Sequence, residues 1–160
     1  MTRSTVWQKL LTDLGVHLAG RMVGETTAVV VDITSSGIIG VSVGDSEAWV
    51  ITDEGIDDLT YHQNKKRLGN GRASPVSFFR PTLDGALLLG SDGLFNYAAP
   101  NTIAEVVRGR APSDAAEGLR AGVLLPSWTY PDDLGIVLVA LRSYEVSMPR
   151  GCPPCSSPGP

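Results

Sequence analysis

Cysteine is almost absent from this chain of 160 residues, and its two cysteines, Cys152 and Cys155, both lie among the last nine positions. A disulfide framework therefore cannot hold the fold together. No apolar run reaches the roughly 18 residues that a membrane-spanning helix needs. The first 20 residues include Lys9, Asp13 and His17, which does not fit a secretory signal. We therefore expect a cytoplasmic protein with no membrane partner.

Excess positive charge and aromatic side chains are also lacking. The chain has 13 Lys and Arg against 17 Asp and Glu, and aromatic residues make up 6% of it. Nucleic-acid-binding domains are usually basic, and single-strand binders use aromatic platforms, so the composition argues against both. Hydrophobic residues, by contrast, make up 42%, which is enough for the core of one domain.

The first half of the chain predicts one helix followed by strands. Thr5 and Gln8 fit a capping box for a helix over 5–19, and its apolar stripe is Trp7, Leu10, Leu11, Leu14 and Leu18. Three short strands over 26–33, 38–43 and 47–52 are separated by tight turns, which predicts an antiparallel meander. Residues 53–84 are acidic and then basic, with several Gly and Pro, and we expect a long, partly irregular surface excursion there.

The second half predicts a buried strand over 86–90, a helix from Asn101 to about 108, and another from Ser113 that ends before Pro126. Residues 134–141 (LGIVLVAL) predict the last core strand. This order of elements indicates an α+β fold. Residues 148–160 contain five prolines, so we expect a domain over 1–147 and a disordered tail over 148–160.

Aspartate recurs beside tight turns at the ends of apolar segments. Asp45, Asp92 and the pair Asp132–Asp133 each lie in such a turn. If these ends converge, their carboxylates suit a hard cation such as Mg²⁺ or Mn²⁺. An aspartate in a turn more often caps its own backbone, and spacing alone does not show convergence, so both interpretations stay open at this point.

Four segments, in order, resemble motifs of the metal-dependent protein phosphatases of type 2C. ETTAVVVDI is similar to their GSTAV strand, VSVGDSEAWVI to VGDSRAY, ALLLGSDGLFNY to LLLCSDGLWD, and PDDLGIVLVAL to their closing DN/DD-x-T-V-V-V strand. The resemblance covers roughly residues 5–142. It implies a four-layer α-β-β-α sandwich of two antiparallel sheets. It also implies hydrolysis of phosphoserine and phosphothreonine in phosphoproteins, with two Mg²⁺ or Mn²⁺ ions as cofactors.

The resemblance also implies roles for individual residues. Asp92 and Asp132 would be the catalytic metal ligands, and Asp45 would help to hold an additional, weaker metal beside Asp92. Gly93 and Asp133 would lie next to these ligands and help to position them, without binding the metal directly. Glu47 departs from the family, which commonly has arginine after Gly-Asp-Ser.

A larger departure is the Asp-Gly-x-Gly-Gly motif, whose aspartate bridges the two metals in the family and which this chain does not contain. The resemblance therefore implies about the C-terminal two-thirds of a catalytic domain, truncated at its N-terminal side. Without a bridging carboxylate, two cations held about 3.5–4 Å apart repel each other strongly. Impaired hydrolysis is thus expected, along with self-association through exposed strand edges. The alternatives are a phosphatase-like module that binds phosphoproteins or a partner chain without turnover, and another carboxylate-metal hydrolase.

Four basic residues in the 53–84 excursion are candidates for gripping a substrate phosphate: Lys65, Lys66, Arg67 and Arg72. A solvated basic turn is the simpler interpretation. Cys152 and Cys155 have redox spacing, but they lie in the proline-rich tail without a strand-helix context, so we interpret the spacing as incidental.

Overall fold

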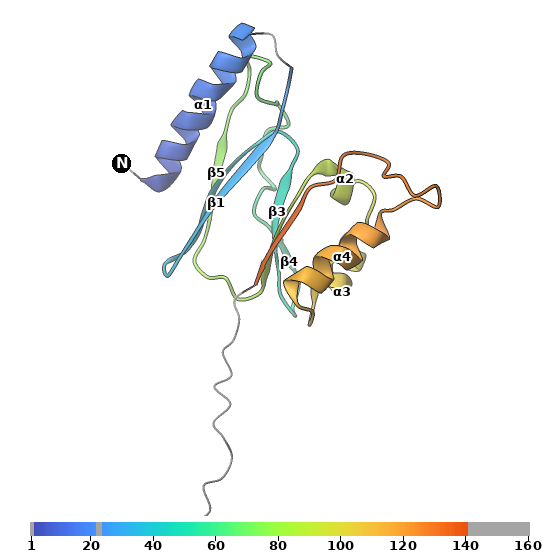
Figure 1. Cartoon of the computed structure of the whole chain (residues 1–160). Helices are drawn as coiled ribbons and strands as arrows, with labels where there is room; N and C mark the ends of the chain where they lie inside the picture. Colours follow the sequence, from blue (N-terminus) through green and yellow to red (C-terminus); the bar gives the residue numbers. More distant parts are fainter. Residues whose placement is uncertain (1, 22–23, 141–160) are drawn as a thin grey trace, which may run out of the picture.

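Two antiparallel sheets form the centre of the computed structural model, which describes residues 2–21 and 24–140 (Figure 1). The helices are α1 (Arg3–Arg21), α2 (Asp92–Phe95), α3 (Pro100–Val107) and α4 (Pro112–Gly122). The strands are β1 (Ala28–Thr34), β2 (Gly37–Val43), β3 (Glu47–Ile51), β4 (Ile56–Asp58), β5 (Val76–Arg80), β6 (Ala86–Gly90) and β7 (Ile136–Ala140).

The strands divide into a three-stranded sheet, β1-β2-β5, and a four-stranded sheet, β4-β3-β6-β7. The predicted meander over 26–52 is therefore wrong in its last step. β2 pairs with β1 and β5, whereas β3 pairs with β4 and β6 in the other sheet. The turn between β2 and β3 crosses from one sheet to the other instead of closing a hairpin. The 53–84 excursion is also more regular than predicted, because β4 and β5 lie within it.

Helix α1 covers the outer face of the three-stranded sheet. Leu11 is buried against Val41, Val43 and Leu68, and Trp7 and Leu18 pack around them. Leu10 and Leu14, which the predicted stripe included, are 51% and 40% exposed. The helix also begins at Arg3, before the predicted Thr5 cap, and the Thr2 hydroxyl accepts the backbone N–H of Thr5 at 3.4 Å.

Helices α3 and α4 cover the outer face of the four-stranded sheet. Leu88 of β6 is fully buried against Leu94, Ile103 and Leu119, which come from α2, α3 and α4. Helix α3 begins with Pro100 as its first residue after Ala99, one residue before the predicted start at Asn101. Proline suits this first position because its missing N–H has no partner there in any helix.

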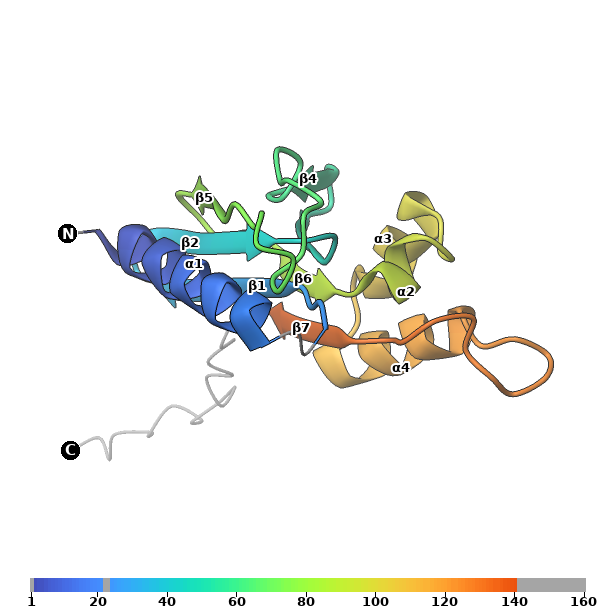
Figure 2. The ribbon, with the colours of Figure 1, turned by 90° about the horizontal axis from the view of Figure 1, so that it is seen from above.

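The inner faces of the two sheets share a core of their own. Ile38 of β2, Val50 of β3 and Leu87 of β6 are 0–1% exposed and form one cluster. Seen from above, α1 lies on one side and α2–α4 on the other, with the strands between (Figure 2). The expected α+β sandwich of two antiparallel sheets, with helices on both outer faces, is confirmed.

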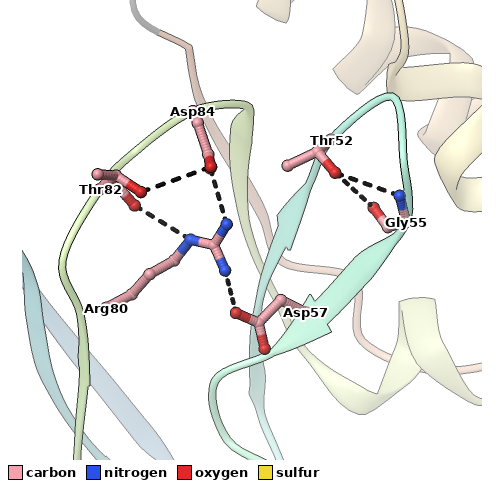
Figure 3. Close-up of polar contacts among 6 residues, drawn as sticks. All are labelled: Thr52, Gly55, Asp57, Arg80, Thr82 and Asp84. Carbon is pink, nitrogen blue, oxygen red and sulfur yellow. Dashed lines mark hydrogen bonds and ion pairs between the residues drawn. The ribbon is translucent and has the colours of Figure 1, made fainter.

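Arg80 joins the two sheets at one end of the sandwich (Figure 3). From β5 its guanidinium pairs with Asp57 of β4, and it also donates to Asp84 Oδ1 at 2.7 Å and to the Thr82 carbonyl at 3.0 Å. The hydrogen bond from Arg80 lowers the pKa of Asp84. Each carboxylate is about half exposed, so this cluster fixes the geometry of the two edges more than it adds stability.

The proline-rich segment 148–160, its boundary at 147 and the Cys152–Cys155 pair lie outside the described residues. Within residues 2–21 and 24–140, no helix is both long and apolar enough to cross a bilayer.

The inter-sheet core predicts one large stability effect. Leu87→Ala leaves a cavity between two sheets that cannot close around it, so the free energy of unfolding should fall by about 2–5 kcal/mol. The control is Val137→Ala in the neighbouring strand, where the side chain is 53% exposed and the change should stay within about 1 kcal/mol. Urea unfolding followed by circular dichroism measures both, and equal effects would show that the inter-sheet cluster is not a core.

Candidate metal centre

The crossing turn between β2 and β3 carries Asp45. Gly44 has a φ of +98°, and a Cβ at this position would lie 2.6 Å from Thr27 Cγ2, so only glycine fits the turn. The hydroxyl of Ser46 in this turn lies 2.7 Å from that of Thr27, which precedes β1. Because the chain passes between the sheets here, the Asp45 carboxylate lies at the end of the sandwich, opposite the Arg80 cluster.

Asp92 follows β6 at the same end of the sandwich, as the first residue of α2. The preceding residue, Ser91, holds this turn against the segment that leads into β7. Its hydroxyl donates to the Asp133 carbonyl at 2.8 Å and accepts the N–H of Gly135 at 2.9 Å. Its own N–H donates to the Gly135 carbonyl at 3.0 Å.

Gly93 brings the Asp92 turn into direct contact with Asp132 and Asp133. A Cβ at Gly93 would overlap the carbonyl oxygen of Asp133 and lie 3.0 Å from its carbonyl carbon. Asp132 and Asp133 are exposed at this edge, and Asp132 Oδ1 accepts the N–H of Asp133 at 2.8 Å. The two turns that carry Asp92 and Asp132 are therefore packed together.

Arg67 connects Asp45 to Asp92. Its Nη2 lies 2.5 Å from Asp45 Oδ2 and 3.7 Å from Asp92 Oδ2, and its Nε donates to the same Asp45 oxygen at 3.2 Å. The hydrogen bond to Asp45 raises the pKa of the Arg67 guanidinium, which is charged at any physiological pH. From the sequence, Arg67 was one candidate for gripping a substrate phosphate, with a solvated basic turn as the simpler interpretation. In the structure it pairs with two carboxylates of the chain itself.

The other predicted basic residues make no ion pair with these carboxylates. Lys65, Lys66 and Arg72 are exposed, and the described residues form no ion pair with them. Glu47 lies just after the crossing turn and accepts a hydrogen bond from Trp49 Nε1 at 2.8 Å. Partial burial, with a smaller contribution from the charge of Asp58, raises the pKa of Glu47. Roles for Lys65, Lys66 and Arg72 toward a phosphate remain predictions.

The oxygen donors at this end of the sandwich are of the type that a hard divalent cation prefers, but they are few. Asp45, Asp92 and Asp132 offer carboxylate oxygens, which Mg²⁺ and Mn²⁺ prefer. However, Arg67 pairs with two of these side chains. Over the described ranges, no three Asp, Glu, His or Cys side chains gather closely enough to hold an ion between them. In their chemistry these residues thus fit part of a metal site, and among the described residues they do not form a complete one.

Solved structures with the same architecture are serine/threonine phosphatases. A bacterial serine phosphatase superposes with a TM-score of 0.75 at 22% identity, over 85% of this chain and 68% of that one. Stp1 from Staphylococcus aureus gives 0.73 at 20% identity, over 88% and 68%. The catalytic domain of the phosphatase PstP, solved in complex with two manganese ions, gives 0.70 at 18% identity, over 82% and 68%.

The chain has the fold of bacterial serine/threonine phosphatases. At these identities the likeness establishes the fold, and the fold expected from the sequence motifs is confirmed. The chain spans 68% of the length of each of these three phosphatases. No protein-family model matches it, and neither does any curated protein.

The close packing at Gly93 predicts a loss of stability at the candidate centre. Gly93→Ala forces the Asp132–Asp133 backbone away, and overpacking of this kind costs about 1–3 kcal/mol of unfolding free energy. Gly20→Ala in α1 is the matched control, because a Cβ there meets nothing within 4 Å. This control should leave stability unchanged or raise it by up to about 1 kcal/mol. Urea unfolding compares them, and equal stabilities would contradict the packing of the two turns.

Proposed function

We propose that this chain is a metal-dependent phosphatase domain that hydrolyses phosphoserine and phosphothreonine in proteins. One observation carries the proposal. In a fold shared with serine/threonine phosphatases, Ser91 and Gly93 pack the Asp92 turn onto the Asp132 turn, and Asp45 lies beside Asp92 at the same end of the sandwich. These are the aspartates that the sequence motifs assign to metal binding.

In this proposal Asp92 and Asp132 are the catalytic metal ligands, and Asp45 helps to bind an additional, weaker metal ion beside Asp92. When bound, Mg²⁺ or Mn²⁺ would supply a water of lowered pKa as the nucleophile and neutralise charge on the phosphoryl group. Gly93 lets the two ligand turns meet, and the backbone N–H of Asp133 orients the Asp132 carboxylate through its 2.8 Å hydrogen bond. Exposed Lys65, Lys66 and Arg72 can attract an anionic phosphoprotein.

The proposal includes a limit on the rate. The chain contains no Asp-Gly-x-Gly-Gly motif, and the described carboxylates do not form a cluster of three. We therefore propose slow hydrolysis by this chain, and faster hydrolysis once a fragment carrying that motif completes the donor set. A cytoplasmic location is part of the same proposal, and the absence of cysteine from residues 1–151 supports it.

Hydrolysis of p-nitrophenyl phosphate and of a phosphothreonine peptide with Mn²⁺ tests this function. The wild-type chain should show slow, Mn²⁺-dependent turnover that rises when the Asp-Gly-x-Gly-Gly fragment is added. Asp92→Asn and Asp132→Asn should each abolish turnover and weaken Mn²⁺ binding in calorimetry by at least about tenfold. Asp53→Asn, the same charge change in the turn after β3, should match wild type. Equal binding heats and rates in all four proteins would refute the site assignment.

We also propose that the chain associates with a second copy of itself. Among the described strands, β1, β5, β4 and β7 lie at sheet edges, and Ile33 on β1 and Val137 on β7 are 38% and 53% exposed. Unpaired edges with apolar side chains favour pairing with another chain.

Light scattering after gel filtration tests this association. Wild type should form dimers or larger species at micromolar concentration, and Val137→Lys should shift the population toward monomer because edge lysines oppose pairing. Val16→Lys on the 68% exposed position of α1 is the control and should leave the distribution unchanged. A wild-type chain that is monomeric at all concentrations would contradict the proposal.

A further inference from the structure

Arg67 occupies the space between two carboxylates that the proposed function assigns to a cation. One nitrogen, Nη2, lies within 4 Å of both Asp45 Oδ2 and Asp92 Oδ2, at 2.5 and 3.7 Å. Nε adds a second contact to Asp45 at 3.2 Å. Two carboxylates that approach one point repel each other unless a positive charge lies between them, and the guanidinium supplies that charge.

The backbone around Arg67 is fixed on both sides. Leu68 is 1% exposed and packs against Leu11, Val41 and Val43. Leu68 also exchanges two backbone hydrogen bonds with Thr26, at 2.8 and 3.0 Å. On the other side, the carbonyl of Asn64 accepts the N–H of Gly44, the residue before Asp45. The loop is thus attached to the strand ends that carry the site, and this attachment places Arg67 at the carboxylates.

The three side chains differ in how strongly water screens them. The Asp45 side chain is 20% exposed and that of Asp92 30%, whereas the Arg67 side chain is 42% exposed. The carboxylates are therefore partly desolvated, which strengthens their attraction for a cation. The more exposed guanidinium has water available on one side when it moves away. A divalent ion that enters between the carboxylates would lie within a few ångströms of the guanidinium and be repelled by it.

We propose that Arg67 is a built-in cation for Asp45 and Asp92, and that a divalent ion binds this pair only by displacing the guanidinium. The inference rests on the proposed metal site and adds that Arg67 regulates how readily this site binds a divalent ion. Arg67 holds the two carboxylates together when no ion is present. It also lowers the affinity of the pair for Mg²⁺ and Mn²⁺, so that only high metal concentrations populate the auxiliary position. Arg67 is a positioning residue in this role.

Mn²⁺ binding to the full chain, followed by the electron paramagnetic resonance signal of free Mn²⁺, tests the competition. Arg67→Gln removes the competing charge, so the affinity for Mn²⁺ should rise about tenfold, which equals about 1.4 kcal/mol. Adding Asp45→Asn to this variant should abolish the gain. Arg110→Gln is the matched control, because it makes the same change in the exposed loop between α3 and α4, and its affinity should equal that of wild type. An Arg67→Gln affinity equal to or below wild type overturns the proposal.

A second variant separates charge from packing. Arg67→Lys keeps the positive charge, so its Mn²⁺ affinity should stay within about threefold of wild type and clearly below that of Arg67→Gln. If Arg67→Gln does not fold, a gain in Arg67→Lys of tenfold or more would overturn the charge argument, and an affinity near wild type would support it.

Thermal unfolding in the presence of a chelator examines the ion pair without any metal. Arg67→Gln and Asp45→Asn should each lower the midpoint, and the double variant should lose less than the sum, because both changes remove one interaction. Additive losses would overturn the inference. Non-additive losses combined with no Mn²⁺ binding by any variant would leave the ion pair but refute both the competition and the proposed metal site. Non-additive losses with tighter binding by Arg67→Gln support the whole proposal, whatever the rate of hydrolysis.

Discussion

The candidate site depends on the hydroxyl of Ser91, which holds two separate turns together at the end of the sandwich. It donates to the Asp133 carbonyl and accepts the N–H of Gly135, while Gly93 allows the backbones to touch. β6 and β7 pair in register up to Gly90 and Ile136, so these contacts continue the sheet one step beyond its last pair. The positions of Asp92 and Asp132 follow from strand pairing, and no separate scaffold is needed to place them.

Most elements could be predicted from the sequence wherever local pattern and burial agree. The strand at 86–90 is apolar throughout and lies at the centre of its sheet, where both faces are buried, so its composition was enough to find it. The turn Gly44-Asp45-Ser46 was misread because a hairpin and a crossing between sheets use the same turn residues. Only the pairing of β3 with β6, 35 or more residues further along the chain, decides between them.

The aspartates of the candidate site could be predicted from the sequence, but the hydrogen bonds and ion pairs that hold them in place could not. Gly-Asp-Ser and Ser-Asp-Gly mark where backbone geometry is special, and both turns lie at the same end of the sandwich. The partner of Arg67 could not be predicted, because it depends on the bridge between Thr26 and Leu68, two residues far apart in the sequence with no recognisable motif. Ser91 was missed for a similar reason, since its hydrogen-bonding partners come from the segment before β7.

The bridge between Thr26 and Leu68 also determines which parts of the structure would move if a metal ion replaced the Arg67 guanidinium at Asp45 and Asp92. Leu68 belongs to the core beneath α1, and its backbone is paired with Thr26, so the chain at this point cannot move without disturbing that core. The Arg67 side chain, however, is long and partly exposed, and rotation about its own bonds is enough to withdraw the guanidinium into water. The proposed exchange of the guanidinium for a metal ion would therefore break an ion pair and desolvate the incoming ion, while the packing of both sheets would stay unchanged. The proposed ion exchange is in this way compatible with a sandwich whose core remains rigid.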